Sequence, residues 1–194
     1  VVVISDEIHA PLVLPGATHT PYLTIAGPQA QAVSVLSASK AWNLPGLKCA
    51  QLVGSPANAE RLKRTLPLEV GFGIGHFGVL GSVAAYRDGG VWLDDVRTVL
   101  DGNRYLLREL LEEHVPSAGY VVPEATYLAW LDMRACGLGD DPAEALLEQG
   151  RVALSAGPAF GTEGRGWARL NFATSPANLT EAVRRIESVS AYPR

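Results

Sequence analysis

The sequence predicts an α/β protein in which a mostly parallel sheet with helices is followed by a small α+β domain. Two β-branched runs, Val1–Ser5 and Val33–Ser37, have the pattern of strands buried on both faces of a parallel sheet. A long helical period then extends from Val91 to Glu113. Short alternating strands take over after it, so we expect one domain at residues 1–117 and a second at residues 118–194.

The first domain contains further elements between these landmarks. The segment Pro11–Pro28 is rich in Pro, Gly, Thr and His without a period, which predicts a loop holding at most one short helical turn. Leu47–Gly54 is a candidate third strand. Asn58 is a suitable cap for a helix that runs to Leu66, and Phe77–Tyr86 has the pattern of a small-residue helix.

The second domain is predicted to mix short strands with two helices. Gly119–Val122 and Thr126–Leu131 are typical of strands, and Trp167–Ala173 alternates in the same way. Asp141-Pro142 supplies an N-cap and a proline at the first helical position. Asn178 is the expected cap of a closing helix that ends near Ser188.

Composition narrows the possible functions. The chain has 194 residues, 47% of them hydrophobic and 19% charged, with a net charge of −4. Such a chain can form a globular core, and its scattered cations do not make the basic surface that nucleic acid requires. Apolar stretches are too short for a membrane span, and Cys49 and Cys136 are expected to be reduced thiols of a cytoplasmic protein. The chain opens on VVVIS without an initiator Met, so we expect it to be part of a longer protein.

Polar side chains follow the first predicted strand. Asp6, Glu7 and His9 come where ligands bind in open α/β sheets, at the carboxyl end of a strand. A solvated acidic strand end explains the same residues equally well. A metal site is less favoured, because neighbouring strand residues point to opposite faces, and we expect no metal.

A second polar cluster follows the second predicted strand. Ser37, Ser39 and Lys40 emerge where the first cluster also points, and Lys48 comes eight residues after Lys40. A lysine amine in a partly desolvated pocket is a nucleophile for a carbonyl cofactor. Hydroxyls with a cation nearby can hold a phosphate.

Three motifs, SDEIH, SASKAWNLPGLK and GRGWARLNFAT, together resemble those of class I/II aminotransferase-like enzymes of fold type I, which use pyridoxal 5'-phosphate (PLP). Their order and spacing match that superfamily. The stretches HFGVLGSVAAY, GVWLDDVRTVLDGNRYLL and EATYLAWLDMRACGL are most similar to the MalY/PatB-type C–S β-lyases, often named cystathionine β-lyases. The likeness covers essentially the entire chain and implies the C-terminal part of the PLP-binding large domain followed by the small domain.

The resemblance implies roles for three residues at the cofactor ring. Lys40 matches the Schiff-base lysine, which also serves as the base for the substrate Cα proton. Asp6 matches the carboxylate that keeps the pyridine nitrogen protonated. His9 stands where aminotransferases usually have a Tyr that contacts the phenolic oxygen, and the lyase-like branch tends to have His.

The resemblance also implies which residues bind the cofactor phosphate and the substrate. Ser37 and Ser39 match phosphate-side hydroxyls, while Lys48 stands where many relatives have a phosphate-binding Arg. Lysine can balance a phosphate as a point charge but cannot bind it bidentately. Arg169 matches the arginine that binds the substrate α-carboxylate, although without the resemblance it would be taken for a surface arginine.

The function implied is α,β-elimination of a cysteine conjugate such as cystathionine to pyruvate, ammonia and a thiol. A PLP-dependent aminotransferase is the alternative, because both reactions begin with the same Cα deprotonation. A second alternative is an inactive fragment or an interaction module. The family's homodimers share active sites, and its phosphate loop and ring-stacking aromatic lie upstream, so we expect a homodimer and an inactive isolated fragment.

Overall fold

The computed structural model describes residues 1–27 and 30–190. The chain folds as two compact units, Val1–Arg97 (unit 1) and Thr98–Arg194 (unit 2). Helix α5 (Gly90–His114) includes the point of division. The predicted division of the chain into domains at residues 117 and 118 stays a prediction.

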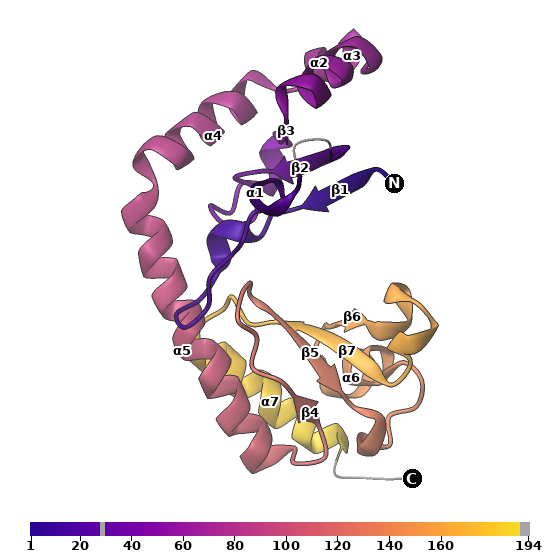
Figure 1. The fold of residues 1–194 in the computed structure, drawn as a ribbon. Coiled ribbons are helices and arrows are strands. Elements are labelled where there is room, and N and C mark those ends of the chain that lie inside the picture. Colours follow the sequence, from indigo (N-terminus) through magenta and orange to yellow (C-terminus); the bar gives the residue numbers. More distant parts are fainter. Residues whose placement is uncertain (28–29, 191–194) are drawn as a thin grey trace. The chain divides into compact units, whose positions relative to one another are not determined.

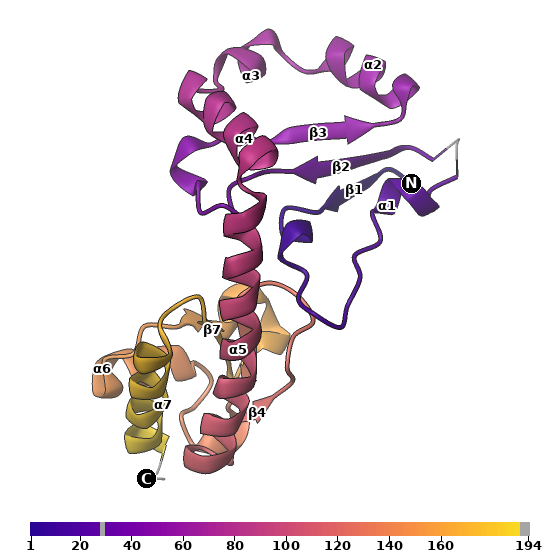
Figure 2. The same ribbon diagram turned by 90° about the vertical axis from the view of Figure 1, so that its left-hand side faces the viewer.

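Unit 1 is built on a sheet with the strand order β1-β2-β3 in the described residues (Figure 1). β1 (Val3–Asp6) and β2 (Ala32–Leu36) are parallel, which confirms the pairing expected from their β-branched runs. β3 (Gln51–Gly54) pairs with β2 in the antiparallel sense, and the three strands lie side by side in Figure 2.

The third strand begins later than predicted. The chain first forms the 3₁₀ turn η2 (Pro45–Leu47), in which proline fixes the backbone for a turn and provides no N–H for a strand ladder. Lys48 then adopts a left-handed conformation with φ of 49°. An extended chain becomes available only after these residues, so the strand starts at Gln51.

The loop after β1 contains two short helical turns in the described residues. They are η1 (Ala10–Leu12) and α1 (Tyr22–Ile25), so the expected loop is confirmed except that it has two turns instead of one. Its last predicted residue, Pro28, lies outside the described residues. Leu12 and Leu14 of this loop are fully buried.

Helices follow β3 in succession. α2 (Pro56–Thr65) and α4 (His76–Asp88) were expected, and the short α3 (Leu68–Phe72) between them was not. The cap prediction for α2 was wrong, because the Ser55 hydroxyl accepts the N-terminal hydrogen bond from the backbone N–H of Asn58. The Asn58 amide instead donates to the backbone carbonyls of Ala30 and Ala32 beside β2.

The long helix α5 is confirmed, with a narrower buried stripe than the apolar residues predict. Its buried leucines include Leu93, Leu100 and Leu107, which recur every seven residues. That spacing keeps them on one side of the helix. The apolar Trp92 and Val99 are exposed, so hydrophobicity alone did not identify the packed face.

Unit 2 contains an antiparallel sheet with the strand order β4-β5-β7-β6 in the described residues. β5 (Leu128–Asp132) and β7 (Trp167–Asn171) are central and confirm two predicted strands. β4 (Gly119–Tyr120) is shorter than expected, and β6 (Ser155–Ala156) was not predicted. Residues on the central strands alternate, and one face buries Ala129, Leu131, Ala168 and Leu170.

Two helices complete unit 2, together with short 3₁₀ turns. α6 (Pro142–Gly150) packs against α7 (Pro176–Ser190), and their predicted positions are confirmed. Asp141 caps α6 as expected, accepting hydrogen bonds from two backbone N–H groups. Ser175, not Asn178, caps α7, since its hydroxyl accepts from the Asn178 N–H at 3.2 Å. The 3₁₀ turns are η3 (Arg134–Cys136), η4 (Gly157–Phe160) and η5 (Thr162–Gly164).

A membrane-spanning helix is not found in residues 1–27 and 30–190, where every helix is too short or too polar to cross a bilayer.

Candidate functional site

Asp6 and the turn that carries Lys40 start from the same edge of the unit 1 sheet. Asp6 is the last residue of β1 and is aligned with Val35, near the end of the parallel strand β2. The Asp6 carboxylate is exposed, and it accepts a hydrogen bond from the Ile8 backbone N–H at 3.1 Å. Because parallel strands end at the same edge, the two polar clusters seen in the sequence lie on neighbouring strand ends.

The turn around Lys40 is anchored by small buried residues. Ala38 and Ala41 on either side of it are each about 1% exposed. The backbone N–H of Trp42 donates to the Ala38 carbonyl at 3.1 Å, which closes the turn. Lys40 is half-buried on this framework, so the backbone that carries its amine is fixed by packing rather than by the lysine itself.

The Ser37 hydroxyl holds this turn against the next segment of chain. It donates to the Cys49 carbonyl at 2.6 Å and accepts from the Ser39 backbone N–H at 3.0 Å. The Ser37 and Ser39 hydroxyl oxygens are also 2.6 Å apart, and Ser39 must be the donor because the Ser37 proton is already engaged. Ser37 therefore has no free hydrogen-bonding position, whereas Ser39 retains lone pairs and is only half-buried.

Lys48 lies near this turn because the residue that follows it, Cys49, is hydrogen-bonded to Ser37. The Lys48 side chain is exposed, and Cys49 provides the carbonyl that binds Ser37. The left-handed backbone at Lys48 is uncommon for a residue with a side chain.

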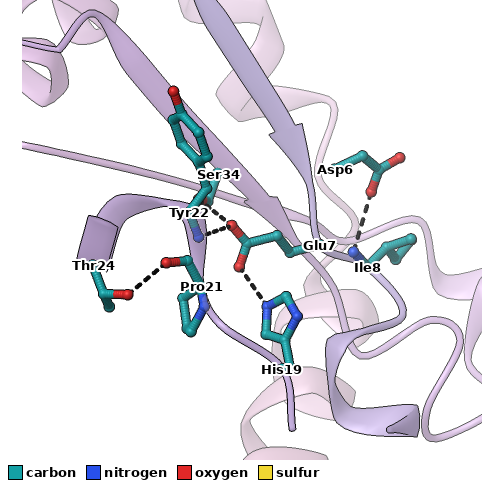
Figure 3. Close-up of polar contacts among 8 residues, drawn as sticks. All are labelled: Asp6, Glu7, Ile8, His19, Pro21, Tyr22, Thr24 and Ser34. Atoms are coloured by element: carbon teal, nitrogen blue, oxygen red, sulfur yellow. Dashed lines mark hydrogen bonds and ion pairs between the residues drawn. The ribbon is translucent and has the colours of Figure 1, made fainter. Parts of the chain in front are cut away.

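Glu7 points to the other side of β1 and is the most heavily bonded side chain at this strand end (Figure 3). Its carboxylate accepts from the Ser34 hydroxyl at 2.7 Å and from the Tyr22 backbone N–H at 3.0 Å. It also pairs with His19 Nε2 at 3.1 Å. Burial of the carboxyl opposes ionisation, but hydrogen bonds, the strongest from Ser34 and His19, outweigh it and lower the pKa from 4.5 to about 2.

His9 belongs to the same short segment. The Ala10 N–H donates to the Glu7 carbonyl at 2.9 Å, and the Leu12 N–H donates to the His9 carbonyl at 2.8 Å. His9 precedes η1 and is half-buried. The arrangement around Glu7 and His19 was missed from the sequence, where the only available signal was the acidic pair at the strand end.

Arg169 lies on β7 in unit 2. Its Nη2 is 3.4 Å from the Ser155 hydroxyl, whereas its Nε is buried and has no hydrogen-bond partner. Only Ser190 Oγ shares that condition among the side chains of the described residues. A buried unpaired guanidinium donor costs free energy unless a ligand or water completes it.

Aromatic rings surround Arg169 on the sheet face opposite the buried core. The guanidinium carbon is 4.6 Å from the centre of the Phe160 ring. Trp130 is the cross-strand neighbour of Arg169, stacks on Trp167 at 5.7 Å and meets Phe160 edge-on at 5.3 Å. We call these side chains, with Ser155, the Arg169 face.

A cavity of about 430 Å³ lies in unit 1 on the Glu7 side of the sheet. Its wall is largely apolar and includes Leu36, Val53, Val79 and Val83. Ser37 is the one predicted site residue that lines it. The cavity is therefore separate from the exposed Asp6 carboxylate and from Lys40.

Six of the predicted site residues belong to unit 1, and Arg169 belongs to unit 2. Those in unit 1 lie at or after the ends of β1 and β2, and they are Asp6, His9, Ser37, Ser39, Lys40 and Lys48. Their contacts with a ligand stay predictions.

Comparison with known proteins identifies relatives over nearly the whole chain. The model of the family described as aminotransferase class I and II matches residues 1–186. A Mycobacterium tuberculosis protein provisionally named cystathionine beta-lyase is 47% identical over 95% of this chain and 49% of its own length. Cystathionine beta-lyase PatB of Bacillus subtilis is 35% identical over 97% of this chain and 49% of its own. The chain thus spans about half the length of the curated relatives it matches.

Solved structures agree with this relationship. A protein of Corynebacterium diphtheriae provisionally described as a PLP-dependent beta-cystathionase has a TM-score of 0.91 and 36% identity, over 98% of this chain and 51% of that one. A PLP-bound C-S lyase from Staphylococcus hominis has a TM-score of 0.88 and 25% identity, over 98% of this chain and 50% of that one.

Proposed function

Because this chain belongs to the aminotransferase class I and II family, we propose that it provides about half of a PLP-dependent C–S β-lyase. The single observation that carries the proposal is the common position of Asp6 and the Lys40 turn at the ends of paired parallel strands. Relatives named cystathionine beta-lyase and PLP-bound structures support the activity and the cofactor.

The residues of unit 1 fit PLP. Lys40, on a turn whose backbone is already fixed, would hold the cofactor through its amine. The exposed carboxylate of Asp6 would accept the hydrogen bond of the pyridine nitrogen, and the Ile8 N–H restrains that carboxylate. His9, three residues on, would hold the phenolic side of the ring. When bound, PLP supplies an electron sink for the charge that develops at the substrate Cα.

The phosphate side is formed by Ser37, Ser39 and Lys48. Ser39 has lone pairs and exposure to offer, and Lys48 supplies a positive charge. A direct contact between Ser37 and phosphate requires its hydroxyl to give up one of its three hydrogen bonds. Ser37 thus contributes first by fixing Ser39 and the Lys48–Cys49 segment.

Arg169 binds the substrate α-carboxylate. Its unpaired Nε gains a partner when an anion arrives, and a planar guanidinium can bind both carboxylate oxygens. Phe160 beneath the guanidinium restrains its plane.

The reaction is elimination from a cysteine conjugate such as cystathionine. The amine of Lys40 accepts the Cα proton, the Cβ–S bond breaks, and the sulfur leaves as a thiol after taking up a proton. The three-carbon remainder takes up water and loses ammonia to become pyruvate. Amino transfer to a 2-oxoacid is the second candidate, favoured by the aminotransferase name of the family model.

The wider organisation follows from the same family membership. Residues 1–117 form the C-terminal part of the PLP-binding large domain, and residues 118–194 form the small domain. The complete enzyme is a cytoplasmic homodimer with shared active sites, and this chain by itself is inactive.

The test uses the full-length enzyme that contains this chain. Purified with PLP, it is given L-cystathionine while pyruvate and thiol are measured, and an amino acid with a 2-oxoacid while amino transfer is measured. Lys40→Ala is the control for both assays. Thiol and pyruvate without amino transfer establish the lyase, and amino transfer alone establishes the aminotransferase. The absence of both activities would contradict the proposal.

A further inference from the structure

We propose that Glu7 is a positioning residue that fixes the β1 end for cofactor binding, acting through Asp6 and His9 on either side of it. This inference rests on the proposed function. Glu7 touches neither cofactor nor substrate in this proposal, since neighbouring residues on a strand point to opposite faces and Asp6 takes the ligand side.

The backbone around Glu7 is held at both ends. Its N–H donates to the Val35 carbonyl at 3.0 Å, which continues the β1–β2 ladder by one residue. Its carbonyl accepts from the Ala10 N–H at 2.9 Å, which starts the turn containing His9. Any rotation of the backbone at Glu7 therefore moves both predicted contacts of the cofactor ring.

The Glu7 side chain joins three separate parts of unit 1. Ser34 comes from the neighbouring strand β2, Tyr22 begins α1, and His19 lies in the loop before it. We call Glu7, His19, Tyr22 and Ser34 the Glu7 clamp, and Figure 3 shows its contacts converging on one carboxylate. The three partners lie 12 to 27 residues away in sequence, so this carboxylate closes long segments of chain onto the strand end.

A carboxylate can accept all three hydrogen bonds of this arrangement at once. An ionised carboxylate only accepts hydrogen bonds, and each partner in the Glu7 clamp can present a donor. A Gln in its place can accept from Ser34 and Tyr22 through its amide oxygen, but its NH₂ group then faces His19 Nε2 and clashes with that nitrogen whenever it carries a proton. Glu7→Gln keeps the size and removes the charge, so it tests the clamp with little change of packing.

The experiment measures PLP binding by the full-length enzyme. The dissociation constant for PLP and the circular dichroism of the bound cofactor are compared for wild type, Glu7→Gln, His19→Ala and His19→Gln. Glu60→Gln is the matched control, because Glu60 is exposed on α2 of the same unit and forms an ion pair with the exposed Lys63. Thermal unfolding is recorded for every variant.

We expect Glu7→Gln to raise the dissociation constant for PLP by about ten-fold, the equivalent of about 1.4 kcal/mol. It should also change the circular dichroism of the cofactor band, which reports how the ring is held. His19→Ala should produce a smaller change in the same direction. His19→Gln should restore values near wild type, because its amide can still donate to Glu7.

A purely structural Glu7 would give a different result. The unfolding temperature would fall in Glu7→Gln and His19→Ala, while the cofactor dichroism and PLP dissociation constant would stay at the wild-type values, and that outcome overturns the inference. If Glu7→Gln does not fold, the two His19 variants decide in the same way. Failure of the wild type to bind PLP through Lys40 would instead overturn the proposed function.

Discussion

The Glu7 clamp in unit 1 and the Arg169 face in unit 2 each contain a charged side chain, but they differ in whether the protein provides hydrogen-bond partners for it. The Glu7 carboxylate is about 5% exposed and has three hydrogen-bond partners from its own chain. Arg169 has a buried Nε without any partner. A charged group whose hydrogen bonds are all made within the protein stabilises the fold, whereas a charged group with an unpaired donor can bind a ligand.

This difference gives the two sites different roles although each carries one charge. Substitutions in the Glu7 clamp should affect stability first and activity through positioning. Substitutions at the Arg169 face should affect substrate binding and leave stability nearly unchanged. The predictions below test that separation, all in the full-length enzyme.

The largest effect is expected for Arg169→Ala. Loss of a bidentate contact with the substrate carboxylate should lower kcat/KM for L-cystathionine by about 10²- to 10⁴-fold, at about 1.5 to 3 kcal/mol for each of its two charged hydrogen bonds. The unfolding temperature should change little, because the variant loses only the long contact with Ser155 and the contact with the exposed Phe160 ring, and it also removes a buried Nε that has no partner. Steady-state kinetics and thermal unfolding measure the two quantities.

Arg165→Ala is the matched control for this prediction. Arg165 is exposed and its nearest carboxylate, Asp140, is 3.6 Å away and also exposed. Its loss should leave kcat/KM unchanged. A fall in stability for Arg169→Ala, without a change in kcat/KM, would contradict the assignment of Arg169 to the substrate.

The next largest effect is the acid sensitivity conferred by Glu7. Its pKa is lowered from 4.5 in the unfolded chain to about 2 in the folded protein, so its contribution to stability is present above pH 4.5 and is lost as the pH falls towards 2. The contribution is about 3 kcal/mol near neutral pH.

Urea unfolding of wild type and Glu7→Gln at a series of pH values measures this contribution. The wild type should be more stable at pH 7, and the difference should shrink steadily below pH 4.5. A difference in stability that stays constant down to pH 2.5 would show that the clamp does not stabilise the ionised form of Glu7.

A smaller effect is expected for Ser34→Ala. The variant removes one of the three hydrogen bonds and leaves the carboxylate with His19 and the Tyr22 N–H, so the free energy of unfolding should fall by about 1 kcal/mol. Ser188→Ala, on the exposed side of α7, should change it by less. Equal effects for the two serines would mean that the clamp adds no stability through Ser34.

The smallest effect is expected for Phe160→Leu. Removing the ring under the Arg169 guanidinium should raise KM about three-fold with kcat unchanged, since an exposed cation–π contact contributes about 0.5 to 1 kcal/mol. The carboxylate contacts themselves remain. A change in kcat larger than the change in KM would place Phe160 closer to the reacting atoms.

The parts of the fold that depend on local pattern could be predicted from the sequence. β1, β2, α5 and the capped helix α6 follow from runs, periods and cap residues that lie close together in the chain. Caps with competing neighbours were assigned wrongly, because Ser55 and Asn58 are both good cap residues and only the folded chain decides between them.

The candidate site also contains residues that could be predicted from the sequence and residues that could not. Lys40, Asp6 and Arg169 were found because they lie in motifs that resemble a known family. His19 was given no role, because its partner Glu7 is 12 residues away and a lone histidine carries no sign of which carboxylate it will meet. The unpaired Nε of Arg169 was equally invisible, since burial without a partner is a property of the folded sheet.

The stacked pair Trp130 and Trp167 has a further consequence. Both indoles lie on the Arg169 face, and the emission of an indole depends on the charges and water near it. Their intrinsic fluorescence should therefore change when a carboxylate reaches Arg169, without any added label. Occupancy of this face could then be followed on the timescale of mixing, separately from any absorbance of the cofactor.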